Sequence, residues 1–167
     1  MKVGESMPKQ KYVQRKNYLD WLKSWREKHV IKVVSGVRRC GKSTLFKLYI
    51  DWLLENGIRP EQIISINLEE LEYEDLLNYR ALYDYIKARF YKDGYTYVFI
   101  DEVQNCKNYE KAVDSLFVKD NVDIYITGSN AYMLSGELAT LLSGRYVQIS
   151  MLPLSFAEYV EFKWLDK

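Results

Sequence analysis

Short apolar runs, rich in β-branched and aromatic residues, alternate along the chain with stretches in which apolar residues recur at helical spacing. The short runs predict strands at residues 31–35, 62–68, 95–101, 122–127 and 145–151. The helical spacing predicts helices around residues 18–25, 45–53, 82–90 and 113–117, with a shorter helical segment at 131–142. Strands that alternate with helices in this way are typical of an α/β fold with a parallel sheet.

Several residues predict where helices begin and end. Gly57 is placed to end the second helix. Ser155, with Glu158 three residues later, forms a capping box that opens a helix near the end of the sequence. Residues 69–75 hold five acids in seven positions and predict a loop or the start of a helix. Residues 1–11 show no periodicity, so we expect a mobile arm there.

The composition is that of one globular domain, with 48% hydrophobic and 28% charged residues in a chain of 167. No apolar run approaches the ~20 residues that a membrane span needs, and the polar start carries no secretory signal. Two cysteines and one histidine exclude a disulfide framework and a zinc site built from several histidines. We therefore expect a cytoplasmic protein with no membrane partner.

The net charge of +1 conceals an asymmetry between the two parts of the chain. Residues 1–47 hold 13 basic and 3 acidic side chains, a net of +10, whereas residues 48–167 hold 11 basic and 20 acidic, a net of −9. The basic first third could face DNA or an acidic protein partner. The simpler interpretation is that some of these cations serve a phosphate site and the rest are solvated.

A phosphate-binding pattern, G-x-x-x-x-G-K-[ST], lies between the first predicted strand and the helix after it. It consists of Gly36, Val37, Arg38, Arg39, Cys40, Gly41, Lys42 and Ser43, and Thr44 follows in the helix. The two glycines permit unusual backbone angles and let amide groups approach phosphate oxygens, and the helix N-terminus attracts anions. Lys42 supplies a charge for the β- and γ-phosphates, and Ser43 offers a hydroxyl to Mg²⁺.

The variable positions of this loop leave alternatives open. Arg38 and Arg39 could touch phosphate, a neighbouring subunit or DNA, or they could point to solvent. Cys40 stands beside a lysine and a helix N-terminus, which favours a lowered thiol pKa and some reactivity. The alternative is that Cys40 is a small buried filler.

A second acidic motif follows about 60 residues later, where a hydrophobic strand ends in Asp101 and Glu102. This is the Walker B arrangement, in which Asp101 holds Mg²⁺ and Glu102 polarises the attacking water. Both acids are expected at the carboxyl edge of the sheet, where open α/β sheets bind ligands. The pair favours hydrolysis of the nucleotide over phosphoryl transfer to a small molecule. The alternative is that two exposed acids simply end a strand.

Further polar residues are expected near that edge, each with a structural alternative. Ser129 or Asn130, after the fourth strand, could sense the γ-phosphate or could belong to a turn. Asn67, at the end of the second strand, could hydrogen-bond Glu102 or could be a turn residue. Arg145 could reach the nucleotide of a neighbouring subunit as an arginine finger, or it could form a surface ion pair.

Together these motifs resemble the AAA-type branch of P-loop ATPases and, more narrowly, a prokaryotic family of AAA-like ATP-binding proteins. The matching phrases are VSGVRRCGKSTL (34–45), INLE (66–69), VFIDEVQ (98–104), YITGSNAYMLSGEL (125–138) and LSGRYVQISMLPLSFAEY (142–159). The resemblance implies a three-layer P-loop NTPase fold with a five-stranded parallel sheet ordered 5-1-4-3-2. It also implies ATP and Mg²⁺ as cofactors, Glu102 as base, Asn130 or Ser129 as sensor, and Asn67 as switch partner of the glutamate.

The resemblance covers roughly residues 14–160. We therefore expect a mobile arm at residues 1–13, an AAA-like ATPase core at 14–160, and at 161–167 the start of a C-terminal region that this sequence cuts short. Family members usually continue into a further domain, so oligomerisation and effector function are expected to depend on that region.

The leading interpretation is a Mg²⁺-dependent ATPase, weak as an isolated domain, whose hydrolysis drives a conformational switch linked to DNA or to other copies of the chain. A GTPase is disfavoured because the guanine-reading Asn-Lys-x-Asp motif is absent. The alternative is a nucleotide-gated binding module, in which ATP occupancy orders a partner surface with little turnover.

Overall fold

A parallel β-sheet forms the centre of the protein in the computed structural model, which describes residues 12–129, 140 and 142–165. Five strands of this part of the chain pair in the order β2-β3-β4-β1-β5, and every pairing is parallel. The expected strand order and α/β class are confirmed. The strands are β1 (Ile31–Gly36), β2 (Ile63–Asn67), β3 (Thr96–Asp101), β4 (Val122–Gly128) and β5 (Tyr146–Met151).

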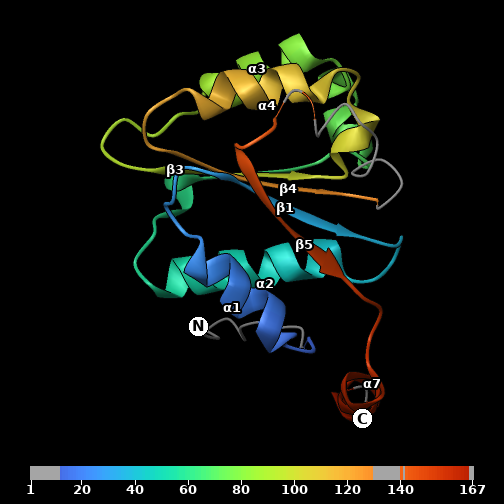
Figure 1. Ribbon diagram of the computed structural model, residues 1–167. Helices are drawn as coiled ribbons and strands as arrows, with labels where there is room; N and C mark the ends of the chain where they lie inside the picture. The colour runs from blue at the N-terminus through green and yellow to red at the C-terminus, as the bar shows by residue number, and fades with distance from the viewer. Residues whose placement is uncertain (1–11, 130–139, 141, 166–167) are drawn as a thin grey trace, which may run out of the picture.

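Helices cover both faces of the sheet and make three layers (Figure 1). On one face lie α1 (Lys16–Ser24) and α2 (Lys42–Glu55), and on the other lie α3 (Tyr79–Lys87) and α4 (Tyr109–Phe117). A fifth described helix, α7 (Phe156–Leu165), follows β5 and lies beyond its end, away from the sheet. Short 3₁₀ helices connect other elements: η1 (Pro60–Gln62), η2 (Leu71–Leu76) and η3 (Val103–Asn105).

Side chains along the central strands point alternately to the two faces of the sheet, and this gives one hydrophobic core on each face. In β3, Tyr97 and Phe99 pack toward α1 and α2, while Val98 and Ile100 pack toward α3 and α4. All four side chains are fully buried, because both faces of the strand are covered by helices. Near-continuous apolar runs in the sequence are what such a doubly covered parallel sheet requires.

The predicted helix ends are confirmed where the structure describes them. Gly57 follows α2 with φ 90°, a left-handed conformation that glycine adopts without strain, and the next amide bonds back to Leu53. Ser155 and Glu158 form the expected capping box, with hydrogen bonds of 2.8 and 3.3 Å between side chain and backbone. The acidic stretch at 69–75 becomes η2. The helical segment expected at 131–142 lies outside the described residues, apart from 140 and 142.

None of the helices in the described residues is long and apolar enough to cross a membrane.

A buried ion pair joins β1 and β4 near the beginning of each strand, at the edge of the sheet opposite the phosphate-binding loop. Lys32 of β1 donates to Asp123 of β4, and neither side chain is exposed to solvent. Both groups make further hydrogen bonds. Lys32 donates to the carbonyl of Lys28 at 2.7 Å, and Asp123 accepts from the amide of Glu27 at 2.8 Å and from the hydroxyl of Tyr125 at 2.7 Å. Burial lowers the pKa of Lys32, against the opposing effect of Asp123.

We expect Asp123→Ala to lower the free energy of unfolding by about 3–5 kcal/mol, because it leaves the Lys32 ammonium buried without its counter-charge. Urea denaturation of the purified chain measures the change. Asp20 pairs with Lys23 at 3.7 Å on the surface, so Asp20→Ala should cost less than about 1 kcal/mol and serves as the matched control. Equal effects of the two substitutions would contradict a structural role for the buried pair.

Candidate nucleotide-binding site

The phosphate-binding pattern forms the loop between β1 and α2, as predicted. Gly41 immediately precedes the helix with φ 98°, and Arg39 also has a left-handed backbone, with φ 65°. The helix begins at Lys42, so its first amide groups are free of intrahelical partners and lie next to the loop. This places the N-terminus of a fourteen-residue helix where an anion would bind.

Gly36 is required for a different reason from the one expected. Its φ is not positive, so backbone freedom does not explain it. A Cβ at this position would lie 2.6 Å from the sulfur of Cys40 and 2.6 Å from the carbonyl oxygen of Met151. Gly36 therefore lies against Cys40 and Met151 with no room for a side chain, and of the two glycines of the pattern Gly41 is the one with a left-handed backbone.

The Lys42 ammonium lies inside the loop and is almost fully buried. It donates to the carbonyls of Gly36 at 3.3 Å and Val37 at 3.2 Å, and it lies 3.3 Å from a carboxylate oxygen of Glu102. These partners keep the charge satisfied in the absence of a phosphate. A nucleotide would have to replace at least part of this set with its own oxygens.

Parallel pairing brings the two acids to the same edge of the sheet as the loop. Asn67, which ends β2, is in register with Asp101, which ends β3, and Thr127 lies near the end of the neighbouring β4. Thr127 is fully buried and its hydroxyl donates to Asp101, while its oxygen accepts from the amide of Glu102 at 2.9 Å. Thr127 thus orients both acids through one side chain.

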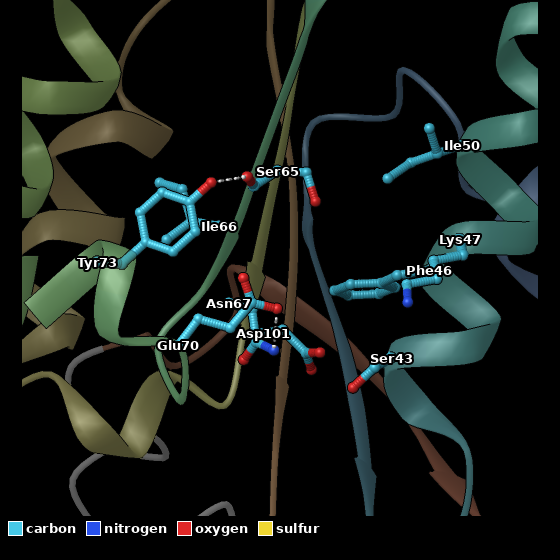
Figure 2. A pocket seen from close by; sticks show the side chains of 10 residues that line it. All are labelled: Ser43, Phe46, Lys47, Ile50, Ser65, Ile66, Asn67, Glu70, Tyr73 and Asp101. Carbon is cyan, nitrogen blue, oxygen red and sulfur yellow. Dashed lines mark hydrogen bonds between the residues drawn. The ribbon is translucent and has the colours of Figure 1, made fainter.

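Asp101 faces Ser43 across the site. Figure 2 shows the Ser43 hydroxyl, from the first turn of α2, pointing toward the Asp101 carboxylate at the end of β3. Burial raises the pKa of Asp101, and hydrogen bonds with the hydroxyls of Ser43 and Thr127 act in the opposite direction. A hydroxyl and a carboxylate in this arrangement are the hard oxygen ligands that Mg²⁺ prefers.

Glu102 is fixed by its backbone as well as by its neighbours. It has φ 55° and ψ 53°, a conformation in which a non-glycine residue is uncommon. Gln104 donates from Nε2 to Glu102 Oε2 at 2.5 Å, so the carboxylate lies between an amide donor and the Lys42 ammonium. The left-handed turn therefore directs Glu102 back over the loop instead of into solvent.

A pocket of about 210 Å³ continues from this edge between α2 and β2 (Figure 2). Ser43 and Asp101 form one end of it, and Asn67 lies beside them. Asn67 does not contact Glu102 in the structure. Its side chain donates to Glu70 at 3.0 Å and accepts from the amide of Glu69 at 3.1 Å, which is the turn role that the sequence left open.

The other predicted site residues are placed in different ways. Arg38 pairs with Glu69 at 3.0 Å and is largely exposed, while Val37 and Arg39 are also exposed. Ser129 is described and half-buried after β4, whereas Asn130 lies outside the described residues. Thr44 lies in the first turn of α2, half-buried behind Ser43.

Arg145 lies at the opposite edge of the sheet. It precedes β5, whose Tyr146 pairs with Ile31 and whose Met151 pairs with Gly36, so about six residues of strand, roughly 20 Å, separate it from the loop. Its guanidinium forms an ion pair with Asp114 of α4. Arg145 therefore does not contribute to the site of its own chain.

Of the two alternatives for Cys40, the structure favours the buried filler. The thiol is buried against Gly36, and burial raises its pKa above the usual range, while Lys42 and Arg15 lower it by less. Cys40 fills the space under the loop, which is the alternative that the sequence left open.

Two residues that position the acids were not singled out from the sequence. Gln104 stands two residues after Glu102 in the segment VFIDEVQ. Its side-chain amide could therefore have been recognised as a donor close to the glutamate. Thr127 is the last β-branched residue of a buried strand, and nothing in its own segment indicates that it bonds Asp101, 26 residues away.

Comparison with known proteins identifies the family. The family model for the AAA domain matches residues 28–160, which include the phosphate loop and both acids. The chain belongs to the AAA domain family. The expected relation to AAA-like P-loop ATPases is thereby confirmed, and nucleotide binding is the property that this AAA domain shares with its family.

A longer relative of this AAA domain occurs in Haemophilus influenzae. That protein, described as uncharacterized, is 44% identical over 155 residues, which is 92% of this chain and 39% of the relative. The chain thus spans well under half the length of the relative that it matches.

Solved structures with the same fold include two archaeal proteins. The Walker-type ATPase PABY2304 of Pyrococcus abyssi has a TM-score of 0.64 at 17% identity, covering 95% of this chain and 59% of that one. The ORC1 protein of Aeropyrum pernix, solved in complex with DNA, has a TM-score of 0.67 at 11% identity, covering 96% of this chain and 52% of that one. At these identities the likeness shows the P-loop NTPase fold alone.

We expect Gly36→Ala to destabilise the AAA domain by about 1–3 kcal/mol, because the added methyl group overpacks the contact between the loop and Met151. ATP affinity should fall with it, since the loop must move to relieve the clash. Thermal unfolding and titration calorimetry measure the two effects. Gly94→Ala is the matched control, because its new Cβ would have no neighbour closer than 3.6 Å. The steric argument is wrong if both variants behave alike.

Proposed function

We propose that this AAA domain binds ATP with Mg²⁺, hydrolyses it, and uses the reaction to drive a conformational switch. The observation that carries the proposal is the convergence of four side chains on one edge of the sheet: Lys42, Ser43, Asp101 and Glu102. Two come from the loop and helix after β1, and two from the end of β3. Each has the chemistry that a bound triphosphate and its hydrolysis require.

Binding rests on the loop and the helix N-terminus. The amide groups of the loop and the first turn of α2 would donate to phosphate oxygens, and the Lys42 ammonium would exchange its carbonyl and carboxylate partners for the β- and γ-phosphates. Val37, Arg38, Arg39 and Cys40 contribute backbone to this cradle. The side chains of Arg38 and Arg39 are exposed to solvent, so these two residues would contact the phosphates through their backbone amides.

The oxygen atoms of Ser43 and Asp101 fit a magnesium ion in this site. They face one another at the end of the pocket. When bound, Mg²⁺ would neutralise charge on the phosphate oxygens. The hydroxyl of Thr127 would keep the Asp101 carboxylate in place for that role.

Hydrolysis depends on Glu102. Once phosphate oxygens draw Lys42 away, the carboxylate is free to accept a proton from water as the water oxygen attacks the γ-phosphorus and ADP leaves. Gln104 would hold Glu102 in position through its hydrogen bond of 2.5 Å. Ser129 is proposed as a sensor of the γ-phosphate because it follows β4 at this edge, and Asn130, which lies outside the described residues, is proposed for the same role from its place in the sequence.

Arg145 is proposed to act on a neighbouring copy. Its distance from the loop of its own chain rules out a role in cis, and its partner Asp114 is a surface residue from which it can be released. An arginine that reaches the γ-phosphate contributes roughly 10³–10⁵ in rate where one is used, so the isolated domain should turn over slowly.

DNA as a partner receives less support than ATP. The structural neighbour ORC1 was solved with DNA, and residues 1–47 are strongly basic. However, several of those cations have partners within the chain, in pairs that include Arg26 with Glu27, Lys32 with Asp123, and Arg38 with Glu69. The proposed function therefore does not include DNA.

We expect Lys42→Ala to weaken ATP binding by about 1.5–3 kcal/mol, or roughly 10- to 150-fold in Kd, because a charged donor to the phosphates is lost. Titration calorimetry with Mg-ATP gives the affinity. Lys87→Ala, at an exposed position of α3 on the other face of the sheet, is the control and should leave Kd nearly unchanged. Equal affinities for wild type and Lys42→Ala would contradict the site.

We expect Glu102→Gln to bind Mg-ATP with normal affinity yet lose about 10²–10⁴ in kcat, because the amide cannot accept the proton. Phosphate release under saturating ATP measures turnover. Asp101→Asn should instead raise the Mg²⁺ concentration needed for tight binding. If wild type binds ATP but turns over no faster than Glu102→Gln, the domain is a nucleotide-gated binding module and the hydrolytic role is wrong.

A further inference from the structure

Arg15 makes an unusual set of contacts for a residue that precedes the first helix. Its side chain is only 5% exposed, and its backbone has φ 43° at the position before α1. One terminal nitrogen donates to the carbonyl of Cys40 at 3.1 Å, and the other donates to the carbonyl of Leu152 at 2.8 Å. Its Nε lies 2.8 Å from a carboxylate oxygen of Glu158.

These three partners belong to three different parts of the molecule. Cys40 is in the phosphate loop, Leu152 directly follows β5, and Glu158 is in the first turn of α7. Tyr18 supports the same junction, because the guanidinium lies 4.7 Å from its ring centre and its hydroxyl accepts from the amide of Leu152 at 3.1 Å. Two donors of the buried guanidinium are paired with carbonyls, while Nε lies beside the Glu158 carboxylate without forming a hydrogen bond to it. Because a buried guanidinium is costly unless its charge and donors are compensated, this arrangement depends on all three parts keeping their places.

The contact with Cys40 bears directly on phosphate binding. In a planar trans peptide the carbonyl and the following amide point in opposite directions. By holding the carbonyl of Cys40 on the side of α1, Arg15 directs the amide of Gly41 the other way. That amide is part of the loop that would surround the phosphates.

The contact with Glu158 bears on α7. The capping box turns the Glu158 carboxylate toward the start of the helix, where its other oxygen accepts from the amide of Ser155 at 2.8 Å. Beyond this point α7 carries large apolar side chains on its surface, with Phe156 83% and Trp164 71% exposed. Arg15 therefore joins the phosphate loop to a helix whose apolar residues face outward.

We propose that Arg15 is a positioning residue that orients the phosphate loop and couples its occupancy by nucleotide to the position of α7. The proposal rests on the proposed function, because it needs a nucleotide to bind the loop. Binding that shifts the Cys40 carbonyl changes the contacts of Arg15, and with them the contact to Glu158. The coupling is reciprocal: if bound nucleotide shifts the equilibrium position of α7 by some factor, a shift of α7 to that position changes nucleotide affinity by the same factor.

The test measures amide hydrogen exchange of residues 156–165 with and without Mg²⁺ and a non-hydrolysable ATP analogue, together with the Kd of that analogue. In the wild-type chain the analogue should change the exchange rate of α7. Arg15→Met should abolish this response and raise Kd by about fivefold or more. Arg15→Lys, which keeps the charge but cannot reach three partners, should restore only part of the affinity.

Glu158→Gln separates the two roles of Arg15. It removes the ionic contact with α7 and leaves the contact with Cys40, so Kd should change less than about twofold while the exchange response of α7 falls. Arg59→Met is the matched arginine control, because Arg59 bonds the hydroxyl of Tyr91 at 3.2 Å on the surface. It should alter neither measurement.

The possible outcomes are distinguishable. Failure of the wild type to bind the analogue would overturn the proposed function and this inference with it. Normal binding with no response of α7, or an unchanged response in Glu158→Gln, would overturn the coupling alone. Thermal unfolding monitors the fold of each variant, and if Arg15→Met does not fold, Glu158→Gln decides the coupling by itself.

Discussion

The alignment of the carboxyl ends of β1, β3 and β4 is the constraint on which the site depends. Parallel hydrogen bonding fixes the register of these strands, so the loop after β1, the acids after β3 and the hydroxyl near the end of β4 meet at one edge. A slip of one residue between these strands would turn every side chain of the slipped strand to the opposite face. Lys42 and Glu102, which now lie 3.3 Å apart, would then no longer meet. The two buried cores hold that register from both sides.

The Lys42 ammonium has partners that a bound phosphate would have to replace. In the structure the charge is shared between loop carbonyls and Glu102, which keeps the glutamate occupied as well as the lysine. In the proposed reaction, a phosphate that takes over Lys42 would also free Glu102, so one exchange of partners would prepare both residues. Binding and catalysis would then be linked through the Lys42 side chain.

The sequence predicts the strands, their order and the phosphate loop because these depend on local patterns: apolar periodicity, glycine spacing, and acids at the end of a hydrophobic run. It does not predict contacts between distant segments. Thr127 bonds Asp101 on the neighbouring strand, 26 positions away, and Arg15 bonds Leu152 at a separation of 137 positions, so neither contact could be found from its own neighbourhood. The sequence also left the environment of Cys40 open, and burial decides it: the loss of water around the thiol raises its pKa by more than Lys42 and Arg15 lower it.

The missing side chain of Gly36 has a mechanical consequence. Since the loop touches the backbone of Met151 with no clearance for even a methyl group, it cannot widen there by deforming alone; the last residue of β5 has to move as well. That residue is the anchor of everything that follows in the chain, including α7. Because Gly36 pairs with the last residue of β5, a displacement of the phosphate loop at this point would be passed directly to the segment that begins after Met151.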